Sequence, residues 1–223
     1  YEHDYVRKTT IEYINNLFKE IPNTKIFISP GNHDPYLNNS IYANFNWNNN
    51  VIIFNSNIKK YSYEDVDIYG YGFTDFYCEN SIINNLKIEN KNKINILVMH
   101  ANLDQISDKK YNEVKTKDLD KLEFDYIALG HIHKRNFDDS MQENIIYPGS
   151  TLALGFDEQG KHGIIEGEIN NKDLKLKFIP LDEKEFNIIN LDVTEIISKE
   201  ELIEKINNLE LIENNYYEII FVG

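Results

Sequence analysis

The chain has 223 residues, of which 41% are hydrophobic, and its 37 acidic against 23 basic side chains give a net charge of −14. No apolar run approaches the roughly 18 residues that a membrane-spanning helix needs, so the composition indicates a soluble globular protein. The acidic balance opposes binding to nucleic acid phosphates, so such a substrate would require bound cations or a basic partner. A single cysteine and the lack of a secretory leader favour the cytoplasm.

The first part of the sequence alternates helical and strand patterns. Residues 4–22 place apolar side chains at helical spacing, with Asp4 as a candidate N-cap, and predict an amphipathic helix. Short runs rich in β-branched and aromatic residues then predict buried strands, and the segments between them indicate α/β layering. The predicted strands are residues 25–29, 51–55, 94–100 and 125–130.

The pattern changes after the fourth of these strands. Closely spaced strand patterns, separated by turn signals such as Pro148-Gly149, predict an antiparallel sheet over residues 145–193. A helical pattern at 198–209 and a strand pattern at 216–223 follow. These last elements predict the start of a second, smaller α/β unit.

Polar side chains that suit metal and proton chemistry follow the predicted strands. Strand ends are the positions from which side chains converge on a ligand in α/β proteins. Amide oxygens and neutral imidazoles are suitable donors for a pair of divalent cations about 3.5–4 Å apart. The candidate residues are Asn32, His33, Asp34, His100, His131 and His133.

Individual roles follow from position. His131 and His133 can converge only if the strand has ended and the backbone turns, and Gly130 supplies the conformationally permissive position for that turn. Histidine is the residue type best suited to donating a proton near neutral pH, so His33 is a candidate to protonate a leaving oxygen beside the metals. Asp34 would then orient His33.

Each of these residues alone also has an ordinary structural explanation. His100 is compatible with a packed histidine at a strand end, and the Asp34-Pro35 step is compatible with a turn. The motifs around Asn32, His100 and His131 nevertheless occur together, in one order and at these spacings, which chance rarely produces. Their combination favours a metal site.

Three segments carry a resemblance to a known family. PGNHD (30–34), VMHANL (98–103) and DYIALGHIHKR (125–135) resemble the later motifs of the calcineurin-like metallophosphoesterases. YPGSTLALGFDEQGKHGIIEGEI (147–169) resembles more narrowly the bacterial DNA repair exonuclease branch, the SbcD/Mre11-like nucleases and their YhaO-like relatives. The resemblance implies an α/β fold, a layered β-sandwich flanked by helices, over residues 1–182, with the start of a small α/β capping domain at 183–223.

The same resemblance implies roles and partners. Asn32, His100 and His131 would hold one divalent metal, His133 would help to hold a second, and His33 would assist phosphodiester cleavage. Manganese is the implied cation, and its preference for nitrogen and oxygen donors agrees with these residues. DNA is the implied substrate, an SbcC/Rad50-like ATPase the implied partner, and a homodimer a further expectation.

The sequence also departs from the family pattern. The Asp-x-His and Gly-Asp motifs of the first strands do not occur in it, although Glu2, His3 and Asp4 are expected to border the site. Without the bridging carboxylate, we expect this chain by itself to bind one metal weakly and to be weakly active or inactive. A sheet without its first strands would have an exposed edge or an unfilled interior.

Other functions remain open at this level. A small phosphodiester as substrate needs no basic surface and agrees with the net charge of −14, and a non-catalytic scaffold is a third alternative. Lys134 and Arg135 could touch a phosphate or could be solvated loop residues. His162 is expected to cap a turn rather than to bind metal.

Overall fold

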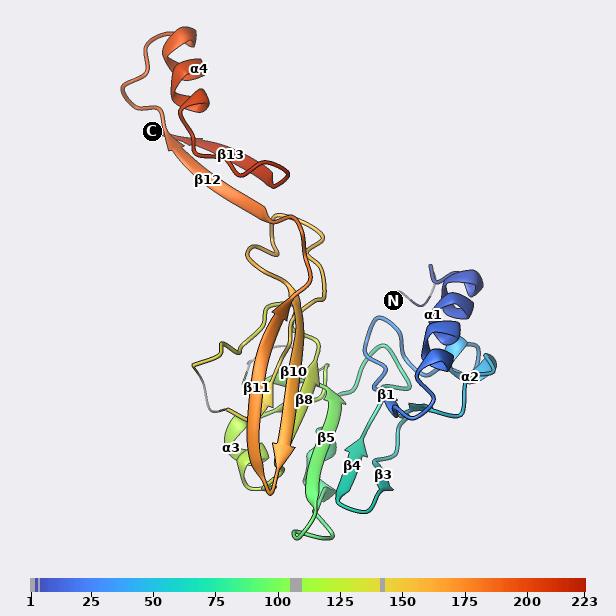
Figure 1. Cartoon of the computed structure of the whole chain (residues 1–223). Coiled ribbons are helices and arrows are strands. Elements are labelled where there is room, and N and C mark those ends of the chain that lie inside the picture. Colours follow the sequence, from blue (N-terminus) through green and yellow to red (C-terminus); the bar gives the residue numbers. More distant parts are fainter. Residues whose placement is uncertain (1–2, 4, 105–109, 141–142) are drawn as a thin grey trace.

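The computed structural model describes residues 3, 5–104, 110–140 and 143–223, and it has the mixed α/β architecture expected from the sequence (Figure 1). The helices are α1 (Lys8–Glu20), α2 (Ile41–Asn44), α3 (Thr116–Asp120) and α4 (Lys199–Asn207), with a 3₁₀ helix η1 (Ile82–Asn85). The strands are β1 (Ile26–Ile28), β2 (Val51–Ile53), β3 (Lys59–Ser62), β4 (Val66–Gly70), β5 (Ile94–His100), β6 (Asn102–Leu103), β7 (Glu113–Val114), β8 (Tyr126–Gly130), β9 (Ile145–Ile146), β10 (Gly163–Asn170), β11 (Asp173–Pro180), β12 (Phe186–Asp192) and β13 (Tyr216–Val222).

A five-stranded sheet in the order β3-β4-β5-β8-β9 forms the centre of the fold. β3 pairs antiparallel with β4, and the remaining neighbours are parallel. β5 is an almost continuous apolar run, which is typical of a parallel strand covered on both faces. On one face, Leu97 and Met99 are buried in one cluster with Leu119 of α3 and with Phe124, and this cluster is the main hydrophobic core.

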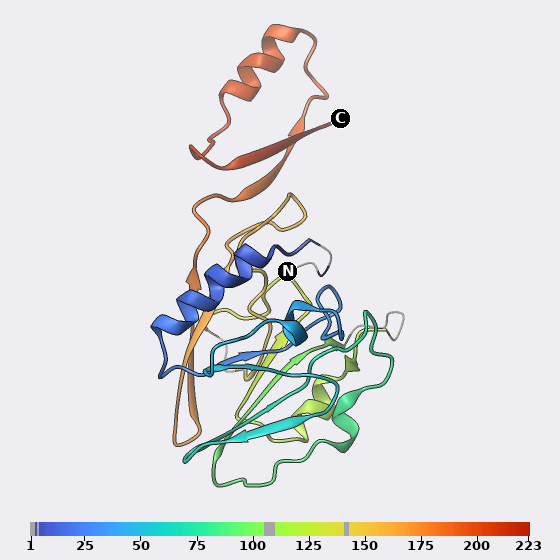
Figure 2. The ribbon, with the colours of Figure 1, turned by 90° about the vertical axis from the view of Figure 1, so that its right-hand side faces the viewer.

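The hairpin β10–β11 lies over the other face of this sheet (Figures 1 and 2). Asn171 and Lys172 join its strands with φ values of 48° and 69°, which give a tight turn that matches the strand twist. An apolar cavity of about 370 Å³ lies between the hairpin and the sheet, lined by side chains such as Ile96, Tyr126 and Ile165. This face of the sheet is therefore less closely packed than the core face.

The expected antiparallel sheet over residues 145–193 is wrong in part. β9 joins the main sheet parallel to β8, and β12 pairs in parallel with β13. Of the described strands in this region, β10 and β11 alone pair antiparallel. The strand positions followed from the local pattern, but the partners depend on contacts between distant segments. In particular, α4 connects β12 to β13 as a crossover, which is the connection that parallel strands require.

The β12-α4-β13 unit projects from one end of the molecule beyond the hairpin (Figures 1 and 2). α4 begins with a side-chain cap, because the Ser198 hydroxyl accepts a hydrogen bond from the Glu201 N–H at 3.2 Å. None of its side chains is buried; Ile203 is 47% exposed, and Ile197 just before the helix is 89% exposed. None of the described helices is both long and apolar enough to cross a membrane.

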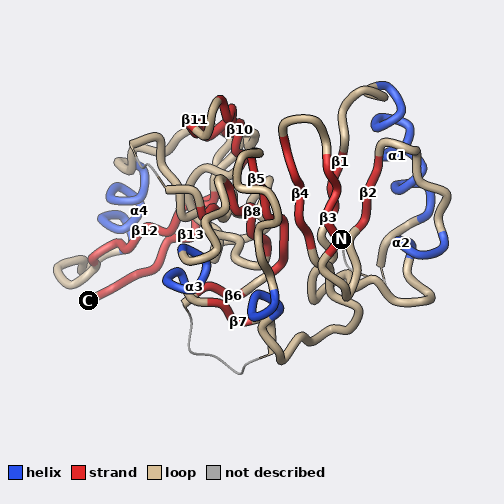
Figure 3. The backbone as a smooth tube through the Cα atoms, turned by 90° about the horizontal axis from the view of Figure 1, so that it is seen from below, coloured by secondary structure: helices blue, strands red, loops and turns tan. Residues whose placement is uncertain are grey.

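β1 and β2 form a separate parallel pair, and α1 and α2 lie on its side away from the main sheet (Figure 3). The Asn50 amide nitrogen lies within 2.9–3.2 Å of the carbonyl oxygens of Phe18, Ile21 and Thr24, and so provides a donor for the carboxyl end of α1. The expected cap of α1, Asp4, lies outside the described residues.

Two aromatic residues attach this pair to the main sheet. Phe54 is fully buried against Gly70 of β4, where a Cβ atom would lie 2.1 Å from the Phe54 ring. Phe73 follows β4, and its N–H donates to the Pro30 carbonyl at 2.9 Å while its carbonyl accepts from the Tyr36 N–H at 2.7 Å. These bonds hold the loop after β1 beside the end of β5.

Candidate metal centre

The candidate site lies at the carboxyl ends of β1, β5 and β8. β5 ends at His100 and β8 ends at Gly130, and these two residues are register partners in the sheet. The loop after β1 is held against the same region through Phe73, whose ring also packs edge-on against the His100 ring at 5.2 Å. The three strand ends thus bring their polar side chains together, as in the ligand crevices of other parallel sheets.

Asn32, His100 and His131 form what we call the amide–imidazole cluster. The Nε2 atom of His100 lies 2.8 Å from Asn32 Oδ1 and 3.1 Å from His131 Nδ1. Burial, assisted by the neighbouring imidazoles, lowers the pKa of His100 to about 3, and burial is also the main cause of the lowered pKa of His131. Both rings are therefore neutral near pH 7, the state in which imidazole donates a lone pair to a metal.

Two glycines and a strained backbone permit the close approach of the side chains in the amide–imidazole cluster. At Gly31 a Cβ atom would lie 2.5 Å from the His100 ring, and at Gly130 it would lie 3.2 Å from His100 Nδ1. His131 has a φ of 115°, which non-glycine residues rarely adopt. Our expectation that Gly130 supplies the turn is therefore wrong. The turn is made at His131, and Gly130 contributes by leaving room for the His100 ring.

Asp34 stabilises the loop that carries the Asn32 amide. Its carboxylate accepts a hydrogen bond from the Gly31 N–H at 2.9 Å and another from the Tyr42 hydroxyl at 2.6 Å. Burial raises the pKa of Asp34, although these two hydrogen bonds act in the opposite direction. Asp34 therefore fixes the shape of the loop that presents Asn32 and His33.

His33 is exposed and lies close to the cluster. Its charge is one of the secondary causes, after burial, of the lowered pKa of both His100 and His131. The N–H of His3 donates to the His33 carbonyl at 2.9 Å, so His3 borders the site as expected. The acidic residues on either side of His3 lie outside the described residues.

His133 forms a separate contact, which we call the His133–Glu158 pair. His133 Nδ1 lies 2.5 Å from Glu158 Oε1, and the Glu158 side chain is 10% exposed whereas that of His133 is 61% exposed. The other oxygen of Glu158 accepts a hydrogen bond from the Leu154 N–H at 3.0 Å. Burial by itself would raise the pKa of Glu158, but the hydrogen bonds from Leu154 and His133 lower it.

Sequence reasoning missed Glu158 and its neighbour Ser150. Glu158 lies 25 residues from His133, in a loop segment without periodicity, so no spacing rule connects the two. The signal was the resemblance of residues 147–169 to one branch of the family. His162, which we expected to cap a turn, is buried and its ring Nδ1 lies 2.7 Å from the Ser150 hydroxyl.

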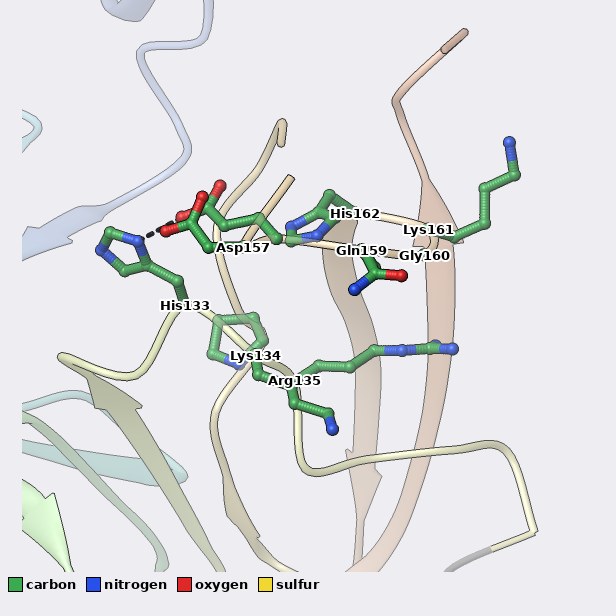
Figure 4. A pocket seen from close by; sticks show the side chains of 10 residues that line it. His133, Lys134, Arg135, Asp157, Gln159, Gly160, Lys161 and His162 are labelled. Carbon is green, nitrogen blue, oxygen red and sulfur yellow. Dashed lines mark hydrogen bonds and ion pairs between the residues drawn. The ribbon is translucent and has the colours of Figure 1, made fainter. Parts of the chain in front are cut away.

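A cavity of about 460 Å³ opens beside His133 (Figure 4). Two of the positively charged side chains that line it already have interaction partners. The Arg135 guanidinium lies 3.8 Å from the centre of the Phe178 ring, and Lys161 Nζ lies 2.6 Å from a Glu185 carboxylate oxygen. The residues that line the cavity include His133, Lys134, Arg135, Asp157, Glu158 and Lys161.

The amide–imidazole cluster fits a divalent cation. Two donors at right angles around an ion, each at about 2.1 Å, lie about 3 Å apart, and the distances in the cluster are 2.8 and 3.1 Å. Two neutral imidazoles and an amide oxygen form a donor set suited to first-row divalent metals. Within the described ranges no group of three or more His, Cys, Asp or Glu side chains is placed to hold a metal, so the amide of Asn32 is essential to the fit.

Comparison with known proteins agrees with this chemistry. A protein of Bacillus subtilis (strain 168), described as the uncharacterized metallophosphoesterase YhaO, is 37% identical over 78 residues, which are 35% of this chain and 19% of that protein. The chain thus matches less than two thirds of that relative's length. The family model for calcineurin-like phosphoesterases matches residues 4–135, which include the amide–imidazole cluster and His133. The chain therefore belongs to the calcineurin-like phosphoesterase family, whose members are hydrolases that typically bind divalent metals.

Proposed function

We propose that the protein is a metal-dependent phosphodiesterase that acts on DNA, as the exonuclease subunit of a DNA repair complex of the SbcD/Mre11-like type. The observation that carries this proposal is the convergence of Asn32 Oδ1 and His131 Nδ1 on His100 Nε2, at 2.8 and 3.1 Å, at the strand ends. The resemblance of residues 147–169 to the exonuclease branch supports the choice of DNA.

In this proposal the amide–imidazole cluster holds one cation and His133 contributes to a second. Mn²⁺ is the proposed ion because it accepts nitrogen and oxygen donors in octahedral arrangements. Bound divalent cations would lower the pKa of water and offset the charge of the phosphoryl oxygens. The contribution of the chain is to keep His100 and His131 neutral through burial and to hold them at fixed distances.

His33 is the proposed proton donor to the leaving oxygen. It is exposed and close to the cluster, so a phosphodiester held there would come within its reach. Asp34 supports this role indirectly. Its bonds to the Gly31 N–H and the Tyr42 hydroxyl fix the loop that carries His33.

The partner and the domain roles are also proposals. The net charge of −14 opposes DNA binding by this chain, so an SbcC/Rad50-like ATPase would supply the positive surface for DNA. Residues 1–182 would form the phosphoesterase domain. Residues 183–223, with the projecting β12-α4-β13 unit, would form part of a capping domain. A homodimer and a cytoplasmic location belong to the same proposal.

A second candidate is a phosphodiesterase for small phosphodiesters such as cyclic nucleotides. The net charge of −14 favours it, because a small substrate needs no extended basic surface. Arg135 and Lys161 beside His133 already contact Phe178 and Glu185, so they are less available to bind an extended phosphate backbone, which agrees with the same alternative.

The test compares substrates on the full-length protein with Mn²⁺. Hydrolysis of a labelled DNA end, of a nucleoside cyclic phosphate and of bis(p-nitrophenyl) phosphate is measured for the wild type and for Asn32→Ala. We expect DNA to be the preferred substrate and the substitution to reduce all hydrolysis by more than about 100-fold, because it removes a metal donor.

Thermal unfolding of Asn32→Ala shows whether the fold survives the substitution. Preference for the cyclic phosphate would transfer the proposal to the small-molecule candidate. Full activity of Asn32→Ala would rule out the amide–imidazole cluster as the metal centre.

A further inference from the structure

We propose that Glu158 is a positioning residue for His133, which it holds so that the ring presents Nε2 as a metal donor. This inference rests on the proposed function, in which His133 is a metal ligand. Its basis is the contact between Glu158 Oε1 and His133 Nδ1 at 2.5 Å. The dashed line at His133 in Figure 4 marks this contact; the Glu158 side chain is drawn there without a label. A histidine ligand commonly donates its second ring N–H to a carboxylate, which fixes the orientation and the tautomer of the ring.

The Glu158 carboxylate is itself anchored. Its Oε2 atom accepts a hydrogen bond from the Leu154 N–H at 3.0 Å and lies 3.4 Å from the Ser150 hydroxyl. The Glu158 N–H donates to the Gly155 carbonyl at 3.1 Å and closes a turn. Because the side chain is only 10% exposed, these bonds leave Oε1 in a fixed place to receive a proton donor.

The same segment also holds the backbone of His133. The Ser150 N–H donates to the His133 carbonyl at 2.8 Å. Gly149 packs so closely there that a Cβ atom would lie 2.6 Å from the His133 carbonyl oxygen, and its φ of 80° favours glycine. Ser150 is fixed in turn by the buried ring of His162, whose Nδ1 lies 2.7 Å from the hydroxyl.

These contacts determine which nitrogen of His133 carries the proton. An ionised carboxylate accepts hydrogen bonds only, so the short contact to Glu158 assigns the proton to Nδ1 and leaves the lone pair on Nε2. Within the described part of the chain the structure gives the His133 ring no other hydrogen bond or ion pair. The ring is 61% exposed, so Glu158 is the main constraint on its orientation.

The first measurement concerns the tautomer in the metal-free, full-length protein. Long-range ¹H–¹⁵N spectra of ¹⁵N-histidine-labelled protein distinguish Nδ1–H from Nε2–H, and the His133 signal is assigned by its loss in His133→Asn. We expect the Nδ1–H form in the wild type and in Glu158→Gln, whose amide oxygen still accepts the proton. In Glu158→Leu, which has no acceptor, the Nε2–H form should become populated.

The second measurement is Mn²⁺ affinity, followed by titration calorimetry. Loss of an orienting carboxylate costs about 10–100-fold in metal affinity, so we expect a decrease of this size for Glu158→Leu and a smaller one for Glu158→Gln. Asp157→Asn is the matched control, because Asp157 is an exposed carboxylate that lines the same cavity, and its affinity should equal that of the wild type. Thermal unfolding verifies that each variant is folded, and Glu158→Gln provides the comparison if Glu158→Leu is not.

Two results would overturn the proposal. One is an Nε2–H tautomer of His133 in the wild type. The other is a Mn²⁺ affinity in folded Glu158 variants no lower than in Asp157→Asn. The proposed function fails on a different observation, namely the absence of Mn²⁺-dependent hydrolysis in the wild type, and the tautomer of the metal-free protein is independent of that outcome.

Discussion

His131 and His133 lie two residues apart on one loop, yet they occupy opposite environments. His131 is partly buried, has a φ of 115°, and faces the neutral ring of His100. His133 is 61% exposed and bonded to the anchored carboxylate of Glu158. Burial and backbone strain hold the first ring, whereas a carboxylate from a distant segment holds the second.

This difference shows that one loop presents two imidazoles with different structural supports. The amide–imidazole cluster is preformed and neutral, and its cost is desolvation and strain within the chain. The His133–Glu158 pair places a negative charge next to the imidazole, which increases the basicity of that ring. Substitutions that disturb packing should therefore affect the cluster, and substitutions that alter charge should affect the pair.

Gly31→Ala should have the largest effect on the cluster. The new Cβ atom would lie 2.5 Å from the His100 ring, so the ring has to move. Because a misplacement of about 1 Å costs about 100-fold in rate, we expect Mn²⁺-dependent hydrolysis of bis(p-nitrophenyl) phosphate by the full-length protein to fall by about that factor.

Gly130→Ala is the graded control for this substitution. Its Cβ atom would lie 3.2 Å from His100 Nδ1, a distance that a small adjustment can relieve. We expect a loss of less than about tenfold. Equal activity of the two variants would show that the position of His100 is not set by these glycines.

The stability of the metal-free protein should fall in acid because of His100. Its pKa is about 3 in the folded protein and 6.5 in the absence of the fold, so between these values the unfolded chain binds more protons. Stability is then lost as the pH falls from 6.5 toward 3, by about 1–2 kcal/mol between pH 7 and pH 5. Urea unfolding in the presence of a chelator, at both pH values, measures this loss. His100→Asn should lose less stability over the same pH interval. An identical loss would contradict the assignment of this acid sensitivity to His100.

The smallest effect concerns the strain at His131. At ordinary positions alanine is more stable than glycine by roughly 0.5–1 kcal/mol, but a φ of 115° reverses this preference. We expect His131→Gly to have a free energy of unfolding about 1 kcal/mol higher than His131→Ala. Both variants lose the imidazole and should lack hydrolysis, so the comparison isolates the backbone. A more stable alanine variant would show that the strain is absent.

The sequence by itself determined the strands on which the candidate site lies and the identity of the candidate residues. Apolar runs at 25–29, 94–100 and 125–130 predicted three strands, observed as β1, β5 and β8, and the polar residues at their ends include the members of the amide–imidazole cluster. The α/β fold class was confirmed by the structure and by the family match. Such features are local, because a strand pattern and the residue that follows it lie within a few positions of each other.

Only the tertiary structure decided which strands pair and which side chains meet. The parallel pairing of β12 with β13, the turn at His131 rather than Gly130, and the contact of His133 with Glu158 all depend on how distant segments meet. A pattern of residue types contains no information about which carboxylate will be buried beside which ring, since that is set by the packing of a loop 25 residues away. The residue types of the candidate site were therefore predictable from the sequence, whereas their geometry depended on the fold.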